Sequence, residues 1–371
     1  FPQLSPALRG VTLRDRQREA VDTAFARRRV ALEFPTGSGK SEIGAEIIRR
    51  HGGMALWLTH RSDLVAQTRE RLHARLGVKI GLLQGQIWDE QQVTIGMVPS
   101  LARRQMPREF WEQWTLLILD EIHHGGSDTW VRVADQCSTA CLRVGLSGTV
   151  ETDDVLRNLR REGITGPRVV VADVASQVAE GFLARPVIRL LAPPLHTYPS
   201  YPQVREAVLP DWRRDPRRLS RLGHRLWAEA YHRGVLGNTA RSHLIIETAA
   251  RHYHQGERVL ILCVRIPHAQ ALDRLAGMQG LDARWCLSTT TPSPDRQAAL
   301  LRFRTLPPPG LLICTPFFRE GMDVPEIDVL ILAGAEESEI AVLQGIGRSL
   351  RPRPDKSHVL IYDCLDGRDP R

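Results

Sequence analysis

Long hydrophobic runs are missing from this 371-residue sequence. No stretch of about 18 uncharged apolar residues occurs, which argues against a membrane-spanning helix. Cysteine is sparse as well, with six residues, and no second ligand pair follows Cys137 and Cys141 at the spacing of a zinc site. The sequence also lacks a low-complexity tail and a visible internal repeat, which argues against a disordered chain or a repeat array. We therefore expect a globular intracellular protein with reduced cysteines.

The residues that are present have the balance of a globular protein, with 42% hydrophobic and 25% charged residues. Lysine and arginine outnumber aspartate and glutamate by 50 to 42, which gives a formal net charge of +8. This positive charge suits a polyanionic partner without proving one. A chain of this length fits two domains of ordinary size.

Short apolar runs rich in β-branched residues alternate with amphipathic segments along the whole chain. The runs cover residues 30–34, 54–59, 93–98, 115–120 and 142–147 in the first half, and 187–191, 259–264, 311–315, 327–333 and 358–363 in the second. Strands that alternate with helices predict parallel sheets built from βαβ units. Two such sets predict two α/β domains, residues 1–185 and 186–371.

A glycine-rich segment, PTGSGKS at residues 35–41, follows the first apolar run and precedes a predicted helix. The backbone N–H groups of such a loop, together with the helix N-terminus, can surround phosphate groups. Lys40 would place a positive charge at the β- and γ-phosphates, and the Ser41 hydroxyl could bind Mg²⁺. Phe34 stands where the strict phosphate-loop pattern has glycine, so a glycine-rich turn without a ligand remains the alternative at this point.

Two adjacent carboxylates, Asp120 and Glu121, end the apolar run at residues 115–120. This arrangement matches the metal- and water-binding site of phosphate-loop ATPases. Asp120 would hold Mg²⁺, and Glu121 would orient and deprotonate the attacking water. Such pairs are commonly solvated surface residues, but a position at the end of a buried type of strand favours catalysis.

These two segments together resemble the superfamily 2 helicases, whose phosphate loop does not rely on the first glycine and whose DExH box resembles DEIHH at residues 120–124. Further segments follow in the order of that family: LRDRQ at 13–17, THR at 59–61, TIGM at 94–97, SGT at 147–149, Thr315 with EGMDVP at 320–325, and QGIGRSLR at 344–351. The last segment and the residues after it resemble most the branch of UvsW-type helicases with their RadD and XPB relatives.

The resemblance implies two RecA-like domains in tandem, each a mostly parallel sheet flanked by helices, with ATP and Mg²⁺ in the cleft between the domains. The residues implied to bind the nucleotide are Arg14, Gln17, Pro35, Thr36, Gly37, Ser38, Gly39, Lys40, Ser41, Gly321 and Asp323. The residues implied in catalysis are Lys40, Asp120, Glu121, Gln344, Arg348 and Arg351. Arg351 is the preferred arginine finger, and Ser41 and Asp120 would hold the metal.

The resemblance also implies a path for nucleic acid. The residues implied to contact it are Thr59, His60, Arg61, Thr94, Gly96, Arg265 and Thr315. Ser147, Gly148 and Thr149 would couple these contacts to the ATP site. Because contacts of this kind reach phosphates rather than bases, binding is expected to be independent of base sequence and strongly dependent on salt.

The sequence therefore predicts a Mg²⁺-dependent ATPase that acts as a DNA helicase or translocase on branched or duplex DNA in repair, recombination or replication. A 3′ to 5′ direction is implied by the resemblance. The expected protein is a monomer that contacts no membrane, in the cytoplasm of a bacterial or phage-infected cell or on its nucleoid. An RNA helicase, the motor of a restriction or defence complex, and a nucleic-acid-binding scaffold with an inactive ATP site are the alternatives.

Overall fold

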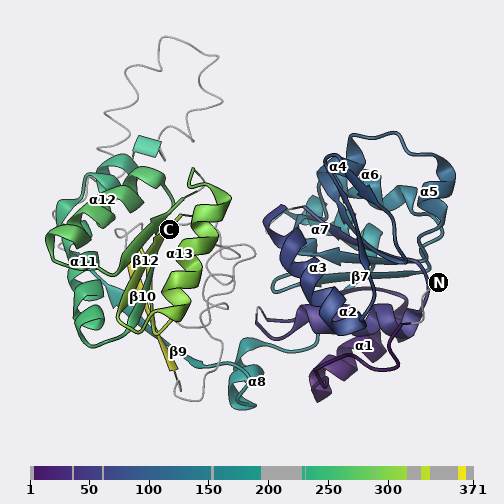
Figure 1. The fold of residues 1–371 in the computed structure, drawn as a ribbon, viewed down its shortest axis with the longest axis horizontal. Coiled ribbons are helices and arrows are strands. Elements are labelled where there is room, and N and C mark those ends of the chain that lie inside the picture. The colour runs from purple at the N-terminus through teal and green to yellow at the C-terminus, as the bar shows by residue number, and fades with distance from the viewer. Residues whose placement is uncertain are drawn as a thin grey trace, which may run out of the picture. The chain divides into compact units, whose positions relative to one another are not determined.

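The chain forms two compact units, Phe1–Leu183 and Ala184–Arg371, which are called the first and second unit here (Figure 1). The computed structural model describes residues 4–35, 37–60, 62–151, 154–193, 228–229, 231–288, 290–315, 327–334 and 358–364. Each unit is considered by itself.

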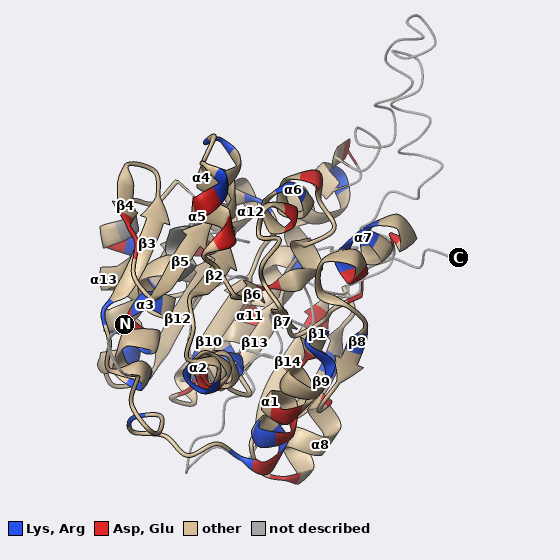
Figure 2. Ribbon diagram, turned by 90° about the vertical axis from the view of Figure 1, so that its right-hand side faces the viewer, with Lys and Arg blue, Asp and Glu red and all other residues tan. Residues whose placement is uncertain are grey.

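An eight-stranded sheet lies at the centre of the first unit, in the order β4-β3-β5-β2-β6-β7-β1-β8. Its strands are β1 (Arg29–Glu33), β2 (Ala55–Thr59), β3 (Ile80–Gln84), β4 (Ile87–Asp89), β5 (Val93–Met97), β6 (Leu116–Asp120), β7 (Leu142–Ser147) and β8 (Arg168–Val170). Neighbouring strands are parallel except in the β3–β4 hairpin. Figure 2 shows the strands side by side, with β3 and β4 at one edge and β8 at the other.

Helices cover both faces of this sheet. They are α1 (Asp15–Arg27), α2 (Lys40–His51), α3 (Ser62–Leu76), α4 (Val98–Ala102), α5 (Arg108–Glu112), the 3₁₀ helix η1 (Ile122–His124), α6 (Asp128–Gln136), α7 (Val155–Thr165) and α8 (Val174–Ala179). Successive residues of a strand point to opposite faces. In β6, Leu116 and Ile118 join the core beneath α1, α2 and α3, whereas Leu117 and Leu119 join the core beneath α4 to α7. Burial on both faces explains why these strands read as continuous apolar runs.

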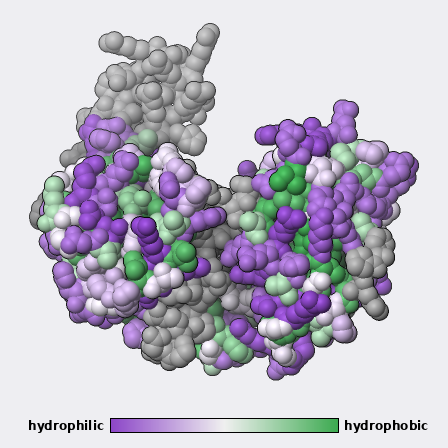
Figure 3. Space-filling view, viewed as in Figure 1, coloured by the Kyte–Doolittle hydropathy of each residue, from purple (hydrophilic) through white to green (hydrophobic). Residues whose placement is uncertain are grey.

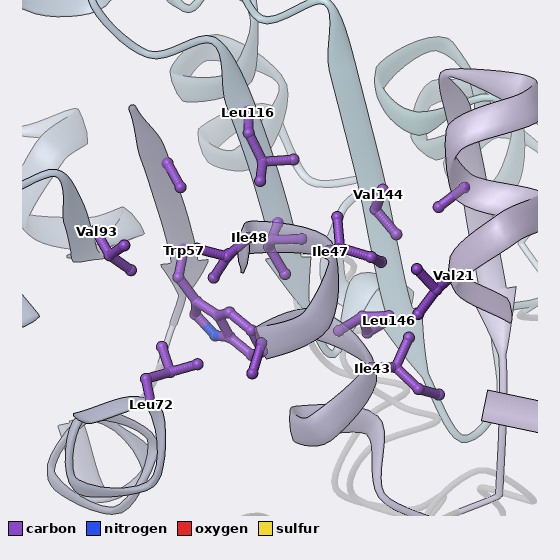
Figure 4. Close-up of a cluster of buried hydrophobic side chains, with 14 of the residues drawn as sticks. Val21, Ile43, Ile47, Ile48, Trp57, Leu72, Val93, Leu116, Val144 and Leu146 are labelled. Atoms are coloured by element: carbon purple, nitrogen blue, oxygen red, sulfur yellow. The ribbon is translucent and has the colours of Figure 1, made fainter. Parts of the chain in front are cut away.

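Helix α2 packs closely against strand β2. A Cβ atom on Gly44 would lie 2.4 Å from Cζ3 of Trp57, so glycine is required for this approach. Figure 4 shows Trp57 among the buried side chains of α2, including Ile43 and Ile47. Because interiors are close-packed, this contact fixes the start of α2 against the sheet, and the glycine-rich loop lies at that start.

The second unit is built on a six-stranded sheet in the order β11-β12-β10-β13-β14-β9. Its strands are β9 (Arg185–Leu191), β10 (Arg258–Leu262), β11 (Arg284–Leu287), β12 (Gly310–Cys314), β13 (Val329–Leu332) and β14 (His358–Cys364), and each pair of neighbours is parallel. The described helices are the π-helical segment η5 (His232–Leu236), α11 (Thr239–His254), α12 (Ile266–Met278) and α13 (Ser293–Thr305). The prediction of two mostly parallel sheets flanked by helices is confirmed.

Two cysteines of the second unit, Cys263 and Cys314, are buried. Among the described residues, no group of histidines, cysteines and carboxylates could hold a metal ion by itself. Hydrophilic residues cover most of the described surface in the view of Figure 3. Within the described part of the chain, every helix is too short or too polar to cross a lipid bilayer.

Candidate nucleotide site and nucleic-acid interface

Three parallel strands bring the candidate nucleotide site together. Strand β7 lies between β1 and β6 and is parallel to both, so the carboxyl ends of all three strands meet at one edge of the sheet. The glycine-rich loop follows β1, Asp120 ends β6, and Ser147 ends β7. Ligands of open α/β sheets bind at this edge, so the position suits a ligand site.

The glycine-rich loop has the backbone geometry that its sequence requires. Gly37 and Gly39 adopt φ angles of 87° and 91°, in the left-handed region that favours glycine. A Cβ atom on Gly39 would lie 2.3 Å from Nε2 of Gln17, so glycine is also required sterically. Lys40 begins α2 directly after this turn, and Pro35 and Ser38 are buried at the base of the loop. The buried Ser38 hydroxyl has no hydrogen-bond partner among the described residues.

The Gln17 side chain stabilises this loop through hydrogen bonds. Its Nε2 donates a hydrogen bond to the Ser38 carbonyl oxygen at 2.8 Å, and its Oε1 accepts one from the Arg14 backbone N–H at 2.9 Å. The Arg14 guanidinium lies 4.1 Å from the centre of the Phe182 ring. Gln17 therefore ties α1 to the phosphate loop, and contact of Gln17 and Arg14 with a nucleotide base remains a prediction.

Asp120 and Glu121 have the electrostatics of a cation-binding site. Burial, with a further contribution from the charge of Glu121, raises the pKa of Asp120 to about 7, and the charge of Lys40 opposes this rise. Glu121 has a φ angle of 51°, which is uncommon for a residue with a side chain. Such backbone strain persists where the surrounding structure enforces it, and it is concentrated at functional sites.

Glu121 is surrounded by hydroxyl and imidazole groups. Its Oε2 lies 3.4 Å from Ser147 Oγ and 3.5 Å from His123 Nδ1. The Ser147 hydroxyl also donates a hydrogen bond to the Thr149 carbonyl oxygen at 2.6 Å, and His123 Nδ1 lies 3.0 Å from Ser147 Oγ. Because a hydroxyl has one hydrogen, the bond to Thr149 leaves the His123 Nδ1–H as the donor to Ser147. Of the three predicted coupling residues, Ser147 therefore lies next to Glu121.

Glu33 connects the base of the phosphate loop to the same segment. Its Oε2 accepts a hydrogen bond from the Val150 backbone N–H at 2.8 Å, and both of its oxygens bind the Arg168 guanidinium, at 2.7 and 2.9 Å. Paired guanidinium–carboxylate bonds of this kind are geometrically specific. Neither Glu33 nor His123 was predicted from the sequence, although Glu33 immediately precedes the loop region and His123 belongs to the DExH box.

Two of the residues expected to contact nucleic acid do not fit that expectation. Thr94 is buried near the amino end of β5, where its hydroxyl donates to the Gln91 carbonyl oxygen at 2.7 Å. Gly96 is buried in the same strand, and a Cβ atom there would lie 2.8 Å from Leu101. Both residues are enclosed by the rest of the first unit.

The other described residues of this group lie at carboxyl ends of strands. Thr59 ends β2 and is buried, and His60 follows it with its ring centre 4.1 Å from that of His124. In the second unit, Arg265 follows β10 and is exposed, and Thr315 follows β12 and is buried. Strands β10 and β12 are parallel neighbours, so Arg265 and Thr315 share one edge of that sheet.

Several predicted residues lie outside the described part of the chain. They are Thr36, Arg61, Gly321, Asp323, Gln344, Arg348 and Arg351. Their roles stay predictions from the sequence.

Comparison with known proteins gives a consistent picture for both units. Residues 10–152 match the family described as type III restriction enzyme, res subunit, and residues 240–353 match the helicase conserved C-terminal domain. The chain is 24% identical to the DNA 3′-5′ translocase XPB2 of Sulfurisphaera tokodaii, over 96% of this chain and 82% of that protein. It is 20% identical to the ATP-dependent DNA helicase uvsW of Enterobacteria phage T4, over 94% of this chain and 68% of that protein.

Other similar proteins are longer than this chain. It is 24% identical to the putative ATP-dependent helicase IRC3 of Saccharomyces cerevisiae over 95% of its own length, but spans only 51% of that protein. Among solved structures, a fragment of a putative HsdR subunit of a type I restriction enzyme from Vibrio vulnificus has a TM-score of 0.70 at 17% identity, over 97% of this chain and 65% of that one. This likeness concerns the fold.

Proposed function

We propose that this chain, which belongs to the superfamily 2 helicases in the branch of XPB and UvsW, is a Mg²⁺-dependent ATPase that moves along DNA. Helicases of this family hydrolyse ATP and bind nucleic acid. The observation that carries the proposal is the meeting of the phosphate loop, Asp120 and Glu121 at the edge formed by β1, β7 and β6. We assign the first unit to the nucleotide-binding domain and the second unit to the C-terminal helicase domain, with the boundary after Leu183, two residues before the boundary expected from the sequence.

The residues of the first unit suit phosphate-transfer chemistry. Lys40 places its ammonium group at the β- and γ-phosphates, where negative charge increases during transfer. Glu121 accepts a proton from the attacking water and holds that water in line with the γ-phosphate. His123 and Ser147 lie beside the Glu121 carboxylate, at 3.5 and 3.4 Å from its Oε2.

A magnesium ion fits the donors that are present. Asp120 is a carboxylate beside the charges of Glu121 and Lys40, and Ser41 adds a hydroxyl in the first turn of α2. Arg71 of α3 reaches the same hydroxyl, with Nη1 3.3 Å from Ser41 Oγ. When bound, Mg²⁺ neutralises charge on the β- and γ-phosphate oxygens.

Replacing Asp120 with asparagine should raise the Mg²⁺ concentration needed for half-maximal ATP turnover at least about tenfold, because a hydrogen-bonded amide is a weaker ligand for a hard cation. The measurement is a Mg²⁺ titration of the initial rate at saturating ATP. Asp89→Asn is the matched control, since Asp89 pairs with Lys79 away from the carboxyl edge. An unchanged Mg²⁺ requirement in Asp120→Asn would remove Asp120 from the metal site.

The proposed nucleotide site also includes residues of the second half of the chain. Arg351, with Arg348 and Gln344, is proposed to stabilise charge on the γ-phosphate, and Gly321 and Asp323 to contact the nucleotide. The support for these roles is the match of the sequence QGIGRSLR to the family pattern. The match of residues 240–353 to the helicase C-terminal domain includes these positions.

DNA is the proposed substrate, with movement from 3′ to 5′. The relatives named above are described as a DNA 3′-5′ translocase and a DNA helicase, which favours DNA over RNA. A net charge of +8 and polar groups at the carboxyl ends of strands suit a phosphate backbone. We further propose that the protein is a monomer in the cytoplasm or on the nucleoid and acts in repair, recombination or replication.

The proposal is tested by measuring ATP turnover with single-stranded, duplex, forked and four-way DNA and with RNA of matched length. We expect DNA to stimulate turnover at least about tenfold more than RNA, and stimulation to fall steeply as salt rises, because phosphate contacts dominate binding. Greater stimulation by RNA would replace the DNA motor with an RNA helicase. Absence of ATP turnover under all conditions would favour the alternative of a nucleic-acid-binding scaffold with an inactive ATP site.

A second candidate is the motor of a restriction or defence complex. The match of residues 10–152 to a restriction-enzyme family and the fold of the HsdR fragment favour it. Such a motor moves along duplex DNA without separating the strands. Displacement of a third strand from a triplex, without release of a strand from a forked duplex, would favour this candidate over a helicase.

A further inference from the structure

A cavity of about 410 Å³ opens beside the residues that follow β2 and β5. It lies between His60, helix α4 and the start of helix α6. The side chains that matter for its chemistry are His60, Pro99, Arg103, His124, Trp130 and Arg132. Ligand sites commonly have volumes of about 300–1,000 Å³, so this cavity is large enough for one small ligand.

The lining of this cavity is positively charged. It includes the exposed residues Arg103 and Arg132, and none of the described lining residues is an aspartate or glutamate. Neither arginine takes part in the ion pairs found between described residues, whereas the nearby Asp128 is paired with Arg160 at 2.7 Å. Two exposed guanidinium groups at one cavity suit an anionic ligand such as a phosphate.

Flat and apolar groups form the inner part of the same cavity. Trp130 is 3% exposed and lies beneath His60, with 6.4 Å between the ring centres. The rings of His60 and His124 are 4.1 Å apart and tilted by 56°. Pro99 and Ala102 of α4 supply an apolar wall. Bases stack on such surfaces without regard to sequence.

Ring contacts continue from the cavity to Glu121. The His123 and His124 ring centres are 4.0 Å apart, and His123 lies 3.5 Å from the Glu121 carboxylate. A ligand against His60 and His124 therefore lies two side chains away from the proposed general base. A ligand that displaces the His124 ring can therefore alter the position of Glu121 through His123.

We propose that this cavity binds one unpaired nucleotide of the nucleic-acid strand. Its base lies against His60 and Pro99, and its phosphate lies between Arg103 and Arg132. The proposal rests on the proposed function and adds a base-stacking interaction to a path otherwise expected to grip phosphates. Binding still depends little on base identity, because every base has a flat face.

The test uses the full chain and a short, labelled oligodeoxythymidine, with affinity measured by fluorescence anisotropy without ATP. Ala102→Trp fills the cavity from α4 and should weaken binding about five- to hundredfold, the range expected when one base can no longer stack. Arg103→Ala combined with Arg132→Ala should lower the slope of log affinity against log salt by about 0.7 for each phosphate that the protein no longer neutralises. Arg108→Ala is the matched control, because Arg108 is an exposed arginine of α5 paired with Glu112.

A second readout does not depend on the variants folding normally. With the fluorescent base 2-aminopurine placed in the oligonucleotide, binding of the wild-type protein should change the emission strongly, because the base stacks in the cavity. Unchanged emission on binding, or affinity and salt slope unchanged in both cavity variants, would overturn the cavity proposal. A wild-type protein that binds no oligonucleotide of any kind would instead contradict the proposed function itself.

Discussion

Replacing Lys40 with alanine should reduce ATP turnover roughly 10²- to 10³-fold or more, as expected when a charged group aimed at the transferred phosphate is removed. Lys40 lies at the first position of α2, directly after the left-handed Gly39, so its side chain begins at the mouth of the phosphate loop. The measurement is the initial rate of phosphate release at saturating ATP and DNA. The fold should be retained, because Lys40 is not part of the buried core.

Lys79→Ala is the matched control for this variant. Lys79 belongs to the same unit, is 64% exposed and pairs with Asp89 at 3.1 Å. An exposed pair of this kind contributes little to stability, so turnover and melting temperature should stay near those of the wild type. Turnover of Lys40→Ala within tenfold of the wild type would show that the loop does not serve the transferred phosphate.

Replacing Glu121 with glutamine should lower kcat roughly 10²- to 10⁴-fold while ATP remains bound. Glutamine keeps the size of the side chain and can still contact Ser147 and His123, but an amide does not accept the proton of the attacking water. The strained backbone at Glu121, with φ of 51°, is also retained. Measurement of kcat beside equilibrium binding of a fluorescent ATP analogue separates the two effects.

Glu112→Gln serves as the control for Glu121→Gln, because Glu112 pairs with Arg108 on α5. Its kcat should equal that of the wild type. If Glu121→Gln retained wild-type kcat, the general base would have to be sought elsewhere. If ATP binding disappeared together with kcat, Glu121 would have a role in holding the nucleotide or the metal.

The main architecture of the first unit follows from its sequence because most of its strands are buried on both faces. Continuous apolar runs therefore marked β1, β2, β5, β6 and β7. Strands β3, β4 and β8 were missed. Two of these are only three residues long, Ile87–Asp89 and Arg168–Val170, and both lie at edges of the sheet, where the burial pattern that reveals a strand is weak.

The arrangement of the candidate nucleotide site was more predictable than that of the candidate nucleic-acid interface. Lys40, Asp120 and Glu121 could be placed at one edge because the loop before Lys40 follows one parallel strand, whereas Asp120 ends another and Glu121 follows it. Thr94 was expected to contact nucleic acid, but it lies near the amino end of its strand. A motif gives the order of segments along the chain and does not show which end of a strand a residue occupies. The Thr94 hydroxyl binds Gln91, near the opposite end of β5 from Met97.

Interactions between residues distant in sequence could not be predicted. The Glu33 carboxylate binds Val150 and Arg168, 117 and 135 positions away. The cavity at Arg103 and Arg132 likewise depends on how α4 packs against α6. No local pattern encodes such pairs, because they arise from the packing of whole helices on a sheet.

A crystal structure of the chain with Mg²⁺ and a non-hydrolysable ATP analogue tests the central claim most directly. We expect the β- and γ-phosphates to lie in the loop with Lys40 against them, the metal to contact the Ser41 hydroxyl on the side of Asp120, and Glu121 to face the γ-phosphate through a water molecule. A triphosphate bound elsewhere, or a metal held by residues other than these while Glu121 faces away, would contradict it.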